Sequence, residues 1–253
     1  MNNSEKTLEQ WAGGSYSPIA LLLTDIIGST NFIKTHGNFA WLEPLRRHFG
    51  RAREIRDRFE GREIKLIGDA YMVAFKTADK ALQFARELIV NTGDSEIFIR
   101  AAIHVGDVWI FENDIYGVMV NFTARLIETV KDIPRNLEPS RIVVSDPAFN
   151  RIKETLGDEI NADFRDYRAR LRSFDEQRAW FYNNQNALAQ LRERRNPQIK
   201  SETLTRRGRL IQPSITQKSQ PMSQPPYSRP STDQSPTIMP IRRFIRDPTK
   251  KED

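Results

Sequence analysis

The sequence feature that most constrains the fold of this chain is an apolar stretch that ends at an aspartate. Residues 19–30 read IALLLTDIIGST, a run typical of a buried strand that meets Asp25 and then a Gly-Ser-Thr triplet suited to a tight turn. An Asp at such a point can cap a following helix by accepting hydrogen bonds from free backbone N–H groups. It can also hold a cation, while the next backbone amides face a phosphate. This stretch alone leaves both interpretations open.

A second acid follows a similar pattern further along the chain. The segment KLIGDAYMVAF places Asp69 after Gly68 and between two runs of strand-forming residues, which predicts a β-hairpin with an acid at its turn. Two carboxylates at the ends of adjacent strands can share divalent cations, and they suffice for Mg²⁺ when a nucleotide supplies phosphate oxygens. Paired metals roughly 3.5–4 Å apart suit phosphoryl transfer. Asp25 and Asp69 together therefore favour a two-metal site.

The other segments alternate between helix and strand patterns. We expect a strand near 18–24, a helix over 31–59, a hairpin over 60–75, a helix over 77–92 and a long strand over 97–111 with a bulge or bend at Gly106. A helix over 117–130, a strand with a capped helix over 141–152 and a closing hairpin over 168–183 follow. This order predicts an α+β sandwich, with one antiparallel or mixed sheet and helices on one face.

Composition excludes several classes of protein. The 253 residues include no cysteine, so disulfides, zinc–thiolate sites and cysteine nucleophiles are ruled out. Apolar runs are far shorter than the roughly 20 residues that a membrane span needs, and the first residues lack the pattern of a secretory signal. We therefore expect a soluble, cytoplasmic protein with no membrane span.

The positive charge is unevenly distributed. The net charge is +6, and the whole excess lies from residue 196 onward, so residues 1–195 are close to neutral. A nucleic-acid-binding domain carries its basic residues on its own surface, and we therefore expect no nucleic-acid partner.

Shifts in composition divide the chain into four parts. We expect a polar lead-in over 1–16, a folded domain over 17–185, a helical and basic linker over 186–195, and a disordered tail rich in Pro, Ser and Gln over 196–253. The segment IMPIRRFIRD near the end either docks on a partner or an anionic surface, or is a solvated tail. No tail partner can be named from the sequence.

Four motifs together carry a family resemblance. TDIIGST, KLIGDAYMVAF, RAAIHVGDV and DIYGVMVNFTARL stand in the order and at the spacing of the class III nucleotide cyclase catalytic domain, over roughly residues 17–185. The chain most resembles the adenylate cyclase-like members of the bacterial stand-alone type. The resemblance implies a ferredoxin-like (βαββαβ) sheet with helices packed on it, and a head-to-tail homodimer.

The resemblance also assigns roles at the nucleotide phosphates. Asp25 and Asp69, with the backbone carbonyl of Ile26, match the ligands of two Mg²⁺ or Mn²⁺ ions per active site. The amides at Ser29 and Thr30 match those that cradle the triphosphate. Some relatives contact the triphosphate with a lysine where this chain has a phenylalanine at position 174; Arg172 is the nearest substitute.

Further matched positions concern the base, the ribose and the reacting phosphate. Lys65 and Asp114 match the adenine-recognising pair, Asn121 the residue that orients the ribose, and Arg125 the arginine that stabilises the transition state. Asn121 and Arg125 are four residues apart on the expected helix and so project from one face. Each position also has a plain structural alternative, namely an edge-strand lysine, a turn acid or an exposed helix face.

By this resemblance the chain is an adenylate cyclase. The 3′-oxygen of ATP would attack the α-phosphate in line, with two metal ions, and yield 3′,5′-cyclic AMP and pyrophosphate. In the dimer, Asp25 and Asp69 of one chain would face Lys65, Asp114, Asn121 and Arg125 of the other. Guanylyl members typically carry Glu and Cys or Ser at the positions of the Lys–Asp pair. A cyclase for GTP or a pyrimidine nucleotide and a catalytically silent nucleotide-binding module remain as alternatives.

Overall fold

A computed structural model describes residues 6–94, 97–132, 141–184, 186 and 188–190. The chain divides into two units, residues 1–209 and 210–253, and the second unit lies outside the described residues. The same holds for the predicted tail over 196–253, and the predicted linker over 186–195 is described only at 186 and 188–190. Within the described residues, no helix is both long and apolar enough to cross a membrane.

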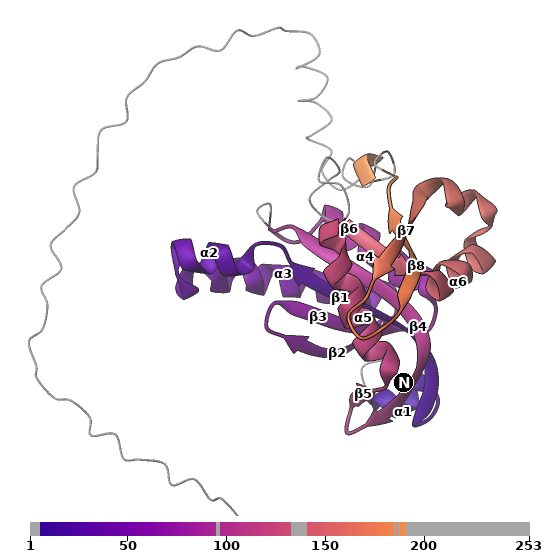
Figure 1. The fold of residues 1–253 in the computed structure, drawn as a ribbon. Coiled ribbons are helices and arrows are strands. Elements are labelled where there is room, and N and C mark those ends of the chain that lie inside the picture. The colour runs from indigo at the N-terminus through magenta and orange to yellow at the C-terminus, as the bar shows by residue number, and fades with distance from the viewer. Residues whose placement is uncertain (1–5, 95–96, 133–140, 185, 187, 191–253) are drawn as a thin grey trace, which may run out of the picture. The chain divides into compact units, whose positions relative to one another are not determined.

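The first unit is built on one mixed sheet flanked by helices (Figure 1). Its strands are β1 (Tyr16–Ile26), β2 (Arg62–Ile67), β3 (Ala70–Phe75), β4 (Ile99–Phe111), β5 (Asp114–Tyr116), β6 (Arg141–Ser145), β7 (Phe164–Arg170) and β8 (Glu176–Tyr182). Its helices are α1 (Leu8–Ala12), α2 (Ser29–His36), α3 (Asn38–Arg58), α4 (Ala78–Val90), α5 (Val118–Glu128) and α6 (Asp146–Leu156), with 3₁₀ turns η1 (Thr129–Asp132) and η2 (Asp158–Asp163).

The strand order confirms the predicted ferredoxin-like core. The sheet runs β2-β3-β1-β4-β6-β8-β7, with β5 paired to β4. In chain order, β1, the helices α2 and α3, β2, β3, α4 and β4 form the βαββαβ unit. Its strands pair antiparallel, and only β6 joins β4 in parallel. The predicted hairpins are β2–β3 and β7–β8.

Helices cover both faces of the sheet, so the prediction of helices on one face is wrong. One core packs the even-numbered residues of β1 against α3, α4 and α6, and the other packs the odd-numbered residues against α1 and α5. Successive side chains of a strand point to opposite faces, and β1 is apolar at nearly every position from Ile19 to Ile26, so both of its faces are buried. This continuous apolar run is visible in the sequence, and it indicates a strand that is buried on both faces.

Three local expectations also need correction. The predicted polar lead-in contains the capped helix α1, in which Leu8 and Trp11 are buried. The expected helix over 31–59 is two helices, because Gly37 ends α2 with a positive φ of 86°. The expected bulge at Gly106 is absent, since Gly106 pairs with Ile19 in an unbroken register between β1 and β4.

Candidate active site

Asp25, Ile26 and Asp69, which we call the metal edge, lie at one end of the sheet. The strands β1 and β3 pair antiparallel, with Thr24 opposite Tyr71. Continuing this register puts Asp25 beside Ala70 and Ile26 beside Asp69, which occupies the β2–β3 turn. Gly68 precedes it with a φ of 63°, a backbone conformation that glycine adopts without strain. Residues 44 positions apart in sequence thus share one edge.

The sequence interpretation did not include an arginine, Arg100, that lies at this edge. Arg100 lies opposite Asp25 in the β1–β4 register. Its Nη2 and Nε atoms are 2.5 Å and 2.7 Å from the Oδ2 atom of Asp25, and both side chains are partly exposed. A guanidinium in this place can also meet phosphate oxygens. Only the pairing of β1 with β4 reveals this contact, because the two residues are far apart in sequence.

Asp69 has spare hydrogen-bonding capacity. Its Oδ2 atom is buried and, within the described residues, has no hydrogen-bond partner. No group of three or more His, Cys, Asp or Glu side chains that could hold a metal occurs among the described residues. In the described part of the chain, Asp69 has a free buried oxygen, and Asp25 is paired with Arg100. Two such carboxylates suit Mg²⁺ or Mn²⁺ ions whose remaining ligands come from nucleotide phosphates.

Ser29 and Thr30 form the first turn of α2, directly after the metal edge. The N-cap residue Gly28 has a φ of 80° and no side chain to accept hydrogen bonds from the first amides of the helix. A cavity of about 300 Å³ lies beside this turn and is lined by Ile26 and Ser29 among other residues. The predicted phosphate cradle therefore has amides without a side-chain cap and open space next to them.

Lys65 and Asp114 lie side by side in one chain. Lys65 on β2 places its Nζ atom 2.5 Å from the Oδ2 atom of Asp114, which begins β5. The Oδ1 atom of Asp114 accepts a hydrogen bond of 2.8 Å from the backbone amide of Ile115, which fixes the carboxylate. Both side chains are partly exposed. The structure thus brings together the two residues that were matched to adenine recognition.

Asn121 and Arg125 lie on α5 as expected. Asn121 is exposed, and the Nη1 atom of Arg125 is 2.7 Å from the Oε1 atom of Glu128. Among the described residues, neither has a recorded hydrogen bond or ion pair with the metal edge or with the Lys–Asp pair. Arg172, in the β7–β8 turn, is exposed, and Phe174 packs edge-on against Phe122 of α5 with ring centroids 5.2 Å apart.

His104 has structural contacts. Its Nδ1 atom is 2.8 Å from the hydroxyl of Ser145, the N-cap residue of α6, and its ring stacks on Phe122. Burial lowers the pKa of His104 to about 4, so the imidazole is neutral near pH 7. These contacts and the low pKa are those of a structural histidine rather than a general base.

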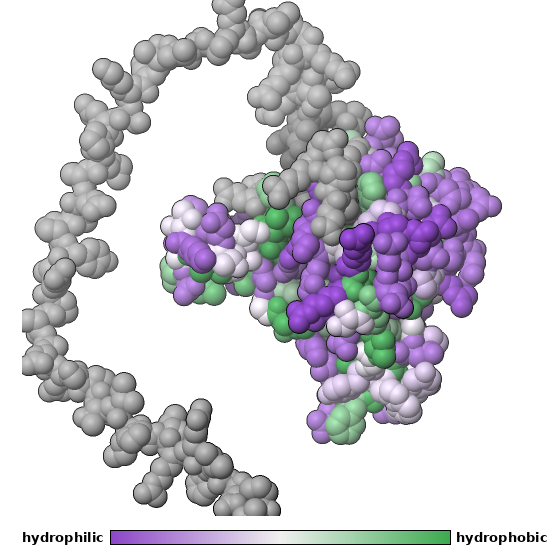
Figure 2. Space-filling view, in the orientation of Figure 1, coloured by the Kyte–Doolittle hydropathy of each residue, from purple (hydrophilic) through white to green (hydrophobic). Residues whose placement is uncertain are grey.

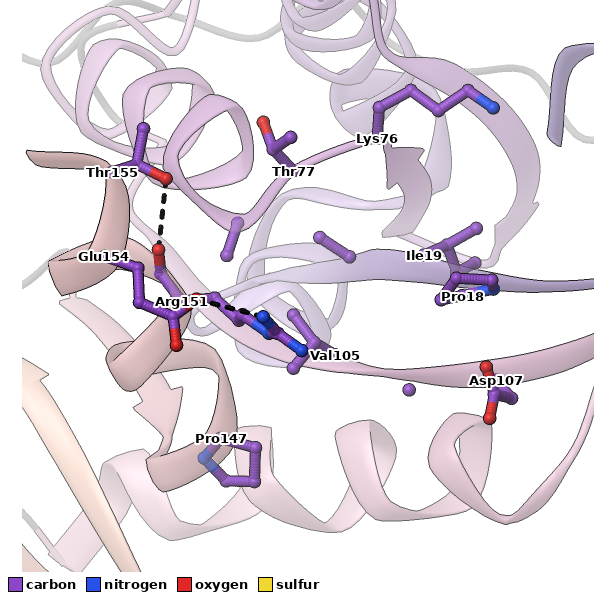
Figure 3. A pocket seen from close by; sticks show the side chains of 13 residues that line it. Pro18, Ile19, Lys76, Thr77, Val105, Asp107, Pro147, Arg151, Glu154 and Thr155 are labelled. Atoms are coloured by element: carbon purple, nitrogen blue, oxygen red, sulfur yellow. Dashed lines mark hydrogen bonds and ion pairs between the residues drawn. The ribbon is translucent and has the colours of Figure 1, made fainter. Parts of the chain in front are cut away.

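A larger cavity lies elsewhere. Figure 3 shows a pocket of about 620 Å³ between β1, β4, α4 and α6, whose charged lining residues are Lys76, Asp107, Arg151 and Glu154. Arg151 pairs with Glu154 across 2.9 Å. None of the predicted site residues lines this pocket.

Comparison with known protein families identifies the family of this chain. The family described as adenylate and guanylate cyclase catalytic domain matches residues 12–154, more than half of the chain. The chain belongs to this family. A comparison with curated proteins finds no match. The predicted membership in the class III nucleotide cyclases is thereby confirmed.

Solved cyclase structures share the fold. An adenylate cyclase structure from Trypanosoma brucei, in its monomeric state, is 22% identical, with a TM-score of 0.54 over 68% of this chain and 90% of that chain. The adenylate/guanylate cyclase/hydrolase from Silicibacter pomeroyi is 21% identical, with a TM-score of 0.54 over 66% and 97%. The guanylate cyclase domain of RhGC from Catenaria anguillulae, in complex with GTP, is 19% identical, with a TM-score of 0.51 over 66% and 96%. Because cyclases of both specificities share this fold, the fold does not choose between ATP and GTP.

Proposed function

We propose that this cyclase domain converts ATP to 3′,5′-cyclic AMP and pyrophosphate. The observation that carries the choice of ATP is the contact between Lys65 and Asp114. The pair offers a donor and an acceptor side by side, and the edge of adenine offers a ring-nitrogen acceptor and an amino donor. Lys65 would donate to the ring nitrogen and Asp114 would accept from the amino group. Guanine carries a ring N–H donor and a carbonyl acceptor at these two positions, so the pair in this orientation favours adenine.

The metal edge would hold two Mg²⁺ or Mn²⁺ ions together with the triphosphate. Such ions would lower the pKa of the 3′-hydroxyl and offset charge on the phosphates when the nucleotide is bound. Asp25 and Asp69 would supply carboxylate oxygens, and the amides at Ser29 and Thr30 would donate to phosphate oxygens. Arg100, freed from Asp25 when that acid binds a cation, would be available to the same phosphates.

On α5, Asn121 would orient the ribose and Arg125 would meet the charge that develops on the α-phosphate. A planar guanidinium donates two parallel hydrogen bonds to phosphate oxygens, which suits this role. In the present chain Arg125 is paired with Glu128, and that exposed pair is weak enough to exchange for a phosphate.

The active enzyme would be a head-to-tail homodimer. Among the described residues, Arg125 pairs with Glu128 and makes no hydrogen bond or ion pair with the metal edge, which supports this proposal, since a second copy can bring the two sets together. Exposed apolar side chains lie around the β4–β5 hairpin that carries Asp114; they are Tyr16, Trp109, Phe111, Tyr116 and Val118. In Figure 2, residues of intermediate hydropathy, drawn pale, lie where α1 and β5 are found, on a face whose other residues are mostly hydrophilic. Such a surface suits a protein interface.

The direct test supplies the purified chain with each of the four nucleoside triphosphates and Mn²⁺, and resolves the products by chromatography. We expect cyclic AMP from ATP. If cyclic GMP or a cyclic pyrimidine nucleotide is the sole product, the proposed specificity is wrong. If no cyclic product forms although a dimer is confirmed by light scattering, the chain is a nucleotide-binding module.

A further inference from the structure

Three side chains at and next to the metal edge each carry a buried polar atom without a hydrogen-bond partner. Among the described residues, these are the Oγ1 atom of Thr24, the Nε2 atom of His48 and the Oδ2 atom of Asp69. Thr24 and His48 are completely buried, and His48 lies near enough to Asp69 to interact with its charge. Buried polar groups are nearly always hydrogen-bonded, so unpaired atoms on neighbouring residues call for an explanation.

Strand register places Thr24 and Asp69 on the same face of the sheet. Thr24 follows Ala20 and Leu22 on the face of β1 that is covered by α3, and it lies opposite Tyr71 of β3. Asp69 precedes Tyr71 by two residues, which puts it diagonally across from Thr24, about 7–8 Å away between Cα atoms. Tyr71 in turn packs against Phe49, the neighbour of His48 in α3, with ring centroids 6.0 Å apart.

The contacts of His48 determine which of its nitrogen atoms carries the proton. Its Nδ1 atom is 2.8 Å from the backbone carbonyl of Thr92, and a carbonyl only accepts hydrogen bonds, so Nδ1 is the donor. In the neutral imidazole the other ring nitrogen is an acceptor, so the buried Nε2 atom presents a lone pair.

The cluster thus holds two acceptors and one donor. The His48 Nε2 and Asp69 Oδ2 atoms accept, and the Thr24 hydroxyl provides one hydrogen; a single water molecule would supply the missing donors. We propose that His48 and Thr24 are positioning residues, which hold the buried oxygen of Asp69 through this water and so orient its carboxylate toward the metal ions. This inference rests on the proposed function, because it assigns Asp69 to the metal site.

The test measures Mn²⁺ binding by the full chain rather than activity. Free Mn²⁺ is followed by electron paramagnetic resonance in the presence of 3′-deoxy-ATP, which lacks the attacking hydroxyl. His48→Asn retains a donor near the Thr92 carbonyl but removes Nε2, and Thr24→Val removes the hydroxyl at nearly constant shape. We expect each to weaken Mn²⁺ binding by about tenfold, the lower end of what lost supporting hydrogen bonds to metal ligands typically cost.

Two controls separate positioning from folding. Thr24→Ser keeps the hydroxyl and should bind Mn²⁺ within about twofold of the unmodified chain. Thermal unfolding of every variant identifies any that fails to fold; if His48→Asn fails, the Thr24→Val and Thr24→Ser pair decides. Unchanged Mn²⁺ affinity in folded Thr24→Val, or equal losses in Thr24→Val and Thr24→Ser, overturns the positioning role.

Asp69→Asn distinguishes this inference from the proposed function. If Asp69→Asn loses Mn²⁺ binding while the folded His48 and Thr24 variants retain it, the positioning role alone is wrong. If Asp69→Asn binds Mn²⁺ as tightly as the unmodified chain, the metal edge itself is wrong, and the positioning role fails with it.

Discussion

The metal edge and the Lys65–Asp114 pair lie on the same sheet but balance their charges differently. At the metal edge there are two acids and one arginine. Arg100 pairs with Asp25, and the buried Oδ2 atom of Asp69 has no partner among the described residues. In the pair, one lysine meets one acid and each neutralises the other. A surplus of negative charge suits the binding of cations, whereas a neutral donor–acceptor pair suits a neutral base. Under the proposed function, the edge governs the rate and the pair governs the choice of nucleotide.

The largest effect is expected at the metal edge. Asp69→Asn removes the surplus charge and should lower turnover at least about 10³-fold with every nucleotide, because the cations offset the charge of the reacting phosphates. Product formation with Mn²⁺, measured by chromatography, checks this, with the thermal unfolding midpoint as the control for folding. Full activity in this variant would remove the two-metal proposal.

The next largest effect is expected on α5, where Arg125, within the described chain, pairs with Glu128 and with neither region. Arg125→Ala should lower kcat by roughly 10³-fold, the lower end of the effect of arginines that stabilise phosphoryl-transfer transition states. Glu128→Gln is the matched control: it removes the partner of Arg125 and should leave kcat within about twofold, since an exposed pair is worth little. Equal losses in both variants would indicate that the α5 helix, and not the guanidinium, matters.

A smaller and different effect is expected at the Lys65–Asp114 pair. Lys65→Glu combined with Asp114→Cys should lower the ratio of kcat/KM for ATP over GTP by roughly 10²-fold, because each mismatched hydrogen-bonding group costs about 1–3 kcal/mol. Steady-state rates with both nucleotides provide the measurement. An unchanged ratio would show that the pair does not recognise the base. The proposed division of rate and nucleotide choice between the two regions would then be wrong.

His104 belongs to neither region, and the smallest effect on catalysis is expected there. The effect expected at His104 is on the pH dependence of stability. Its pKa is about 4 in the folded chain against 6.5 in the unfolded chain, so the unfolded state binds more protons between these values. The free energy of unfolding should therefore fall by about 3 kcal/mol as the pH drops from 7 to 4 because of this group. His104→Gln should remove that part of the pH dependence in denaturant titrations. An identical pH dependence in the two proteins would contradict the burial of a neutral imidazole.

Local signals predicted most of the elements. Strand-forming residues around a Gly-Asp turn predicted the β2–β3 hairpin, and the expected capped helix within 141–152 is α6, with Ser145 as its N-cap and Pro147 in its first turn. The helix α1 was missed although its capping pair, Thr7 and Gln10, is visible in the sequence, because the segment is short and mostly polar. Such signals span only a few residues, which is why a single sequence is enough to read them.

The sequence by itself determined the catalytic family, through four motifs in order, and the identity of the residues matched to metal, base and phosphate. Only the tertiary structure decided that Arg100 holds Asp25, that Lys65 reaches Asp114, and that His48 lies near Asp69. These contacts join residues that are tens of positions apart in the sequence. They depend on which strands pair and in which register, and no local pattern encodes that, because pairing is set by burial of both faces of the sheet at once.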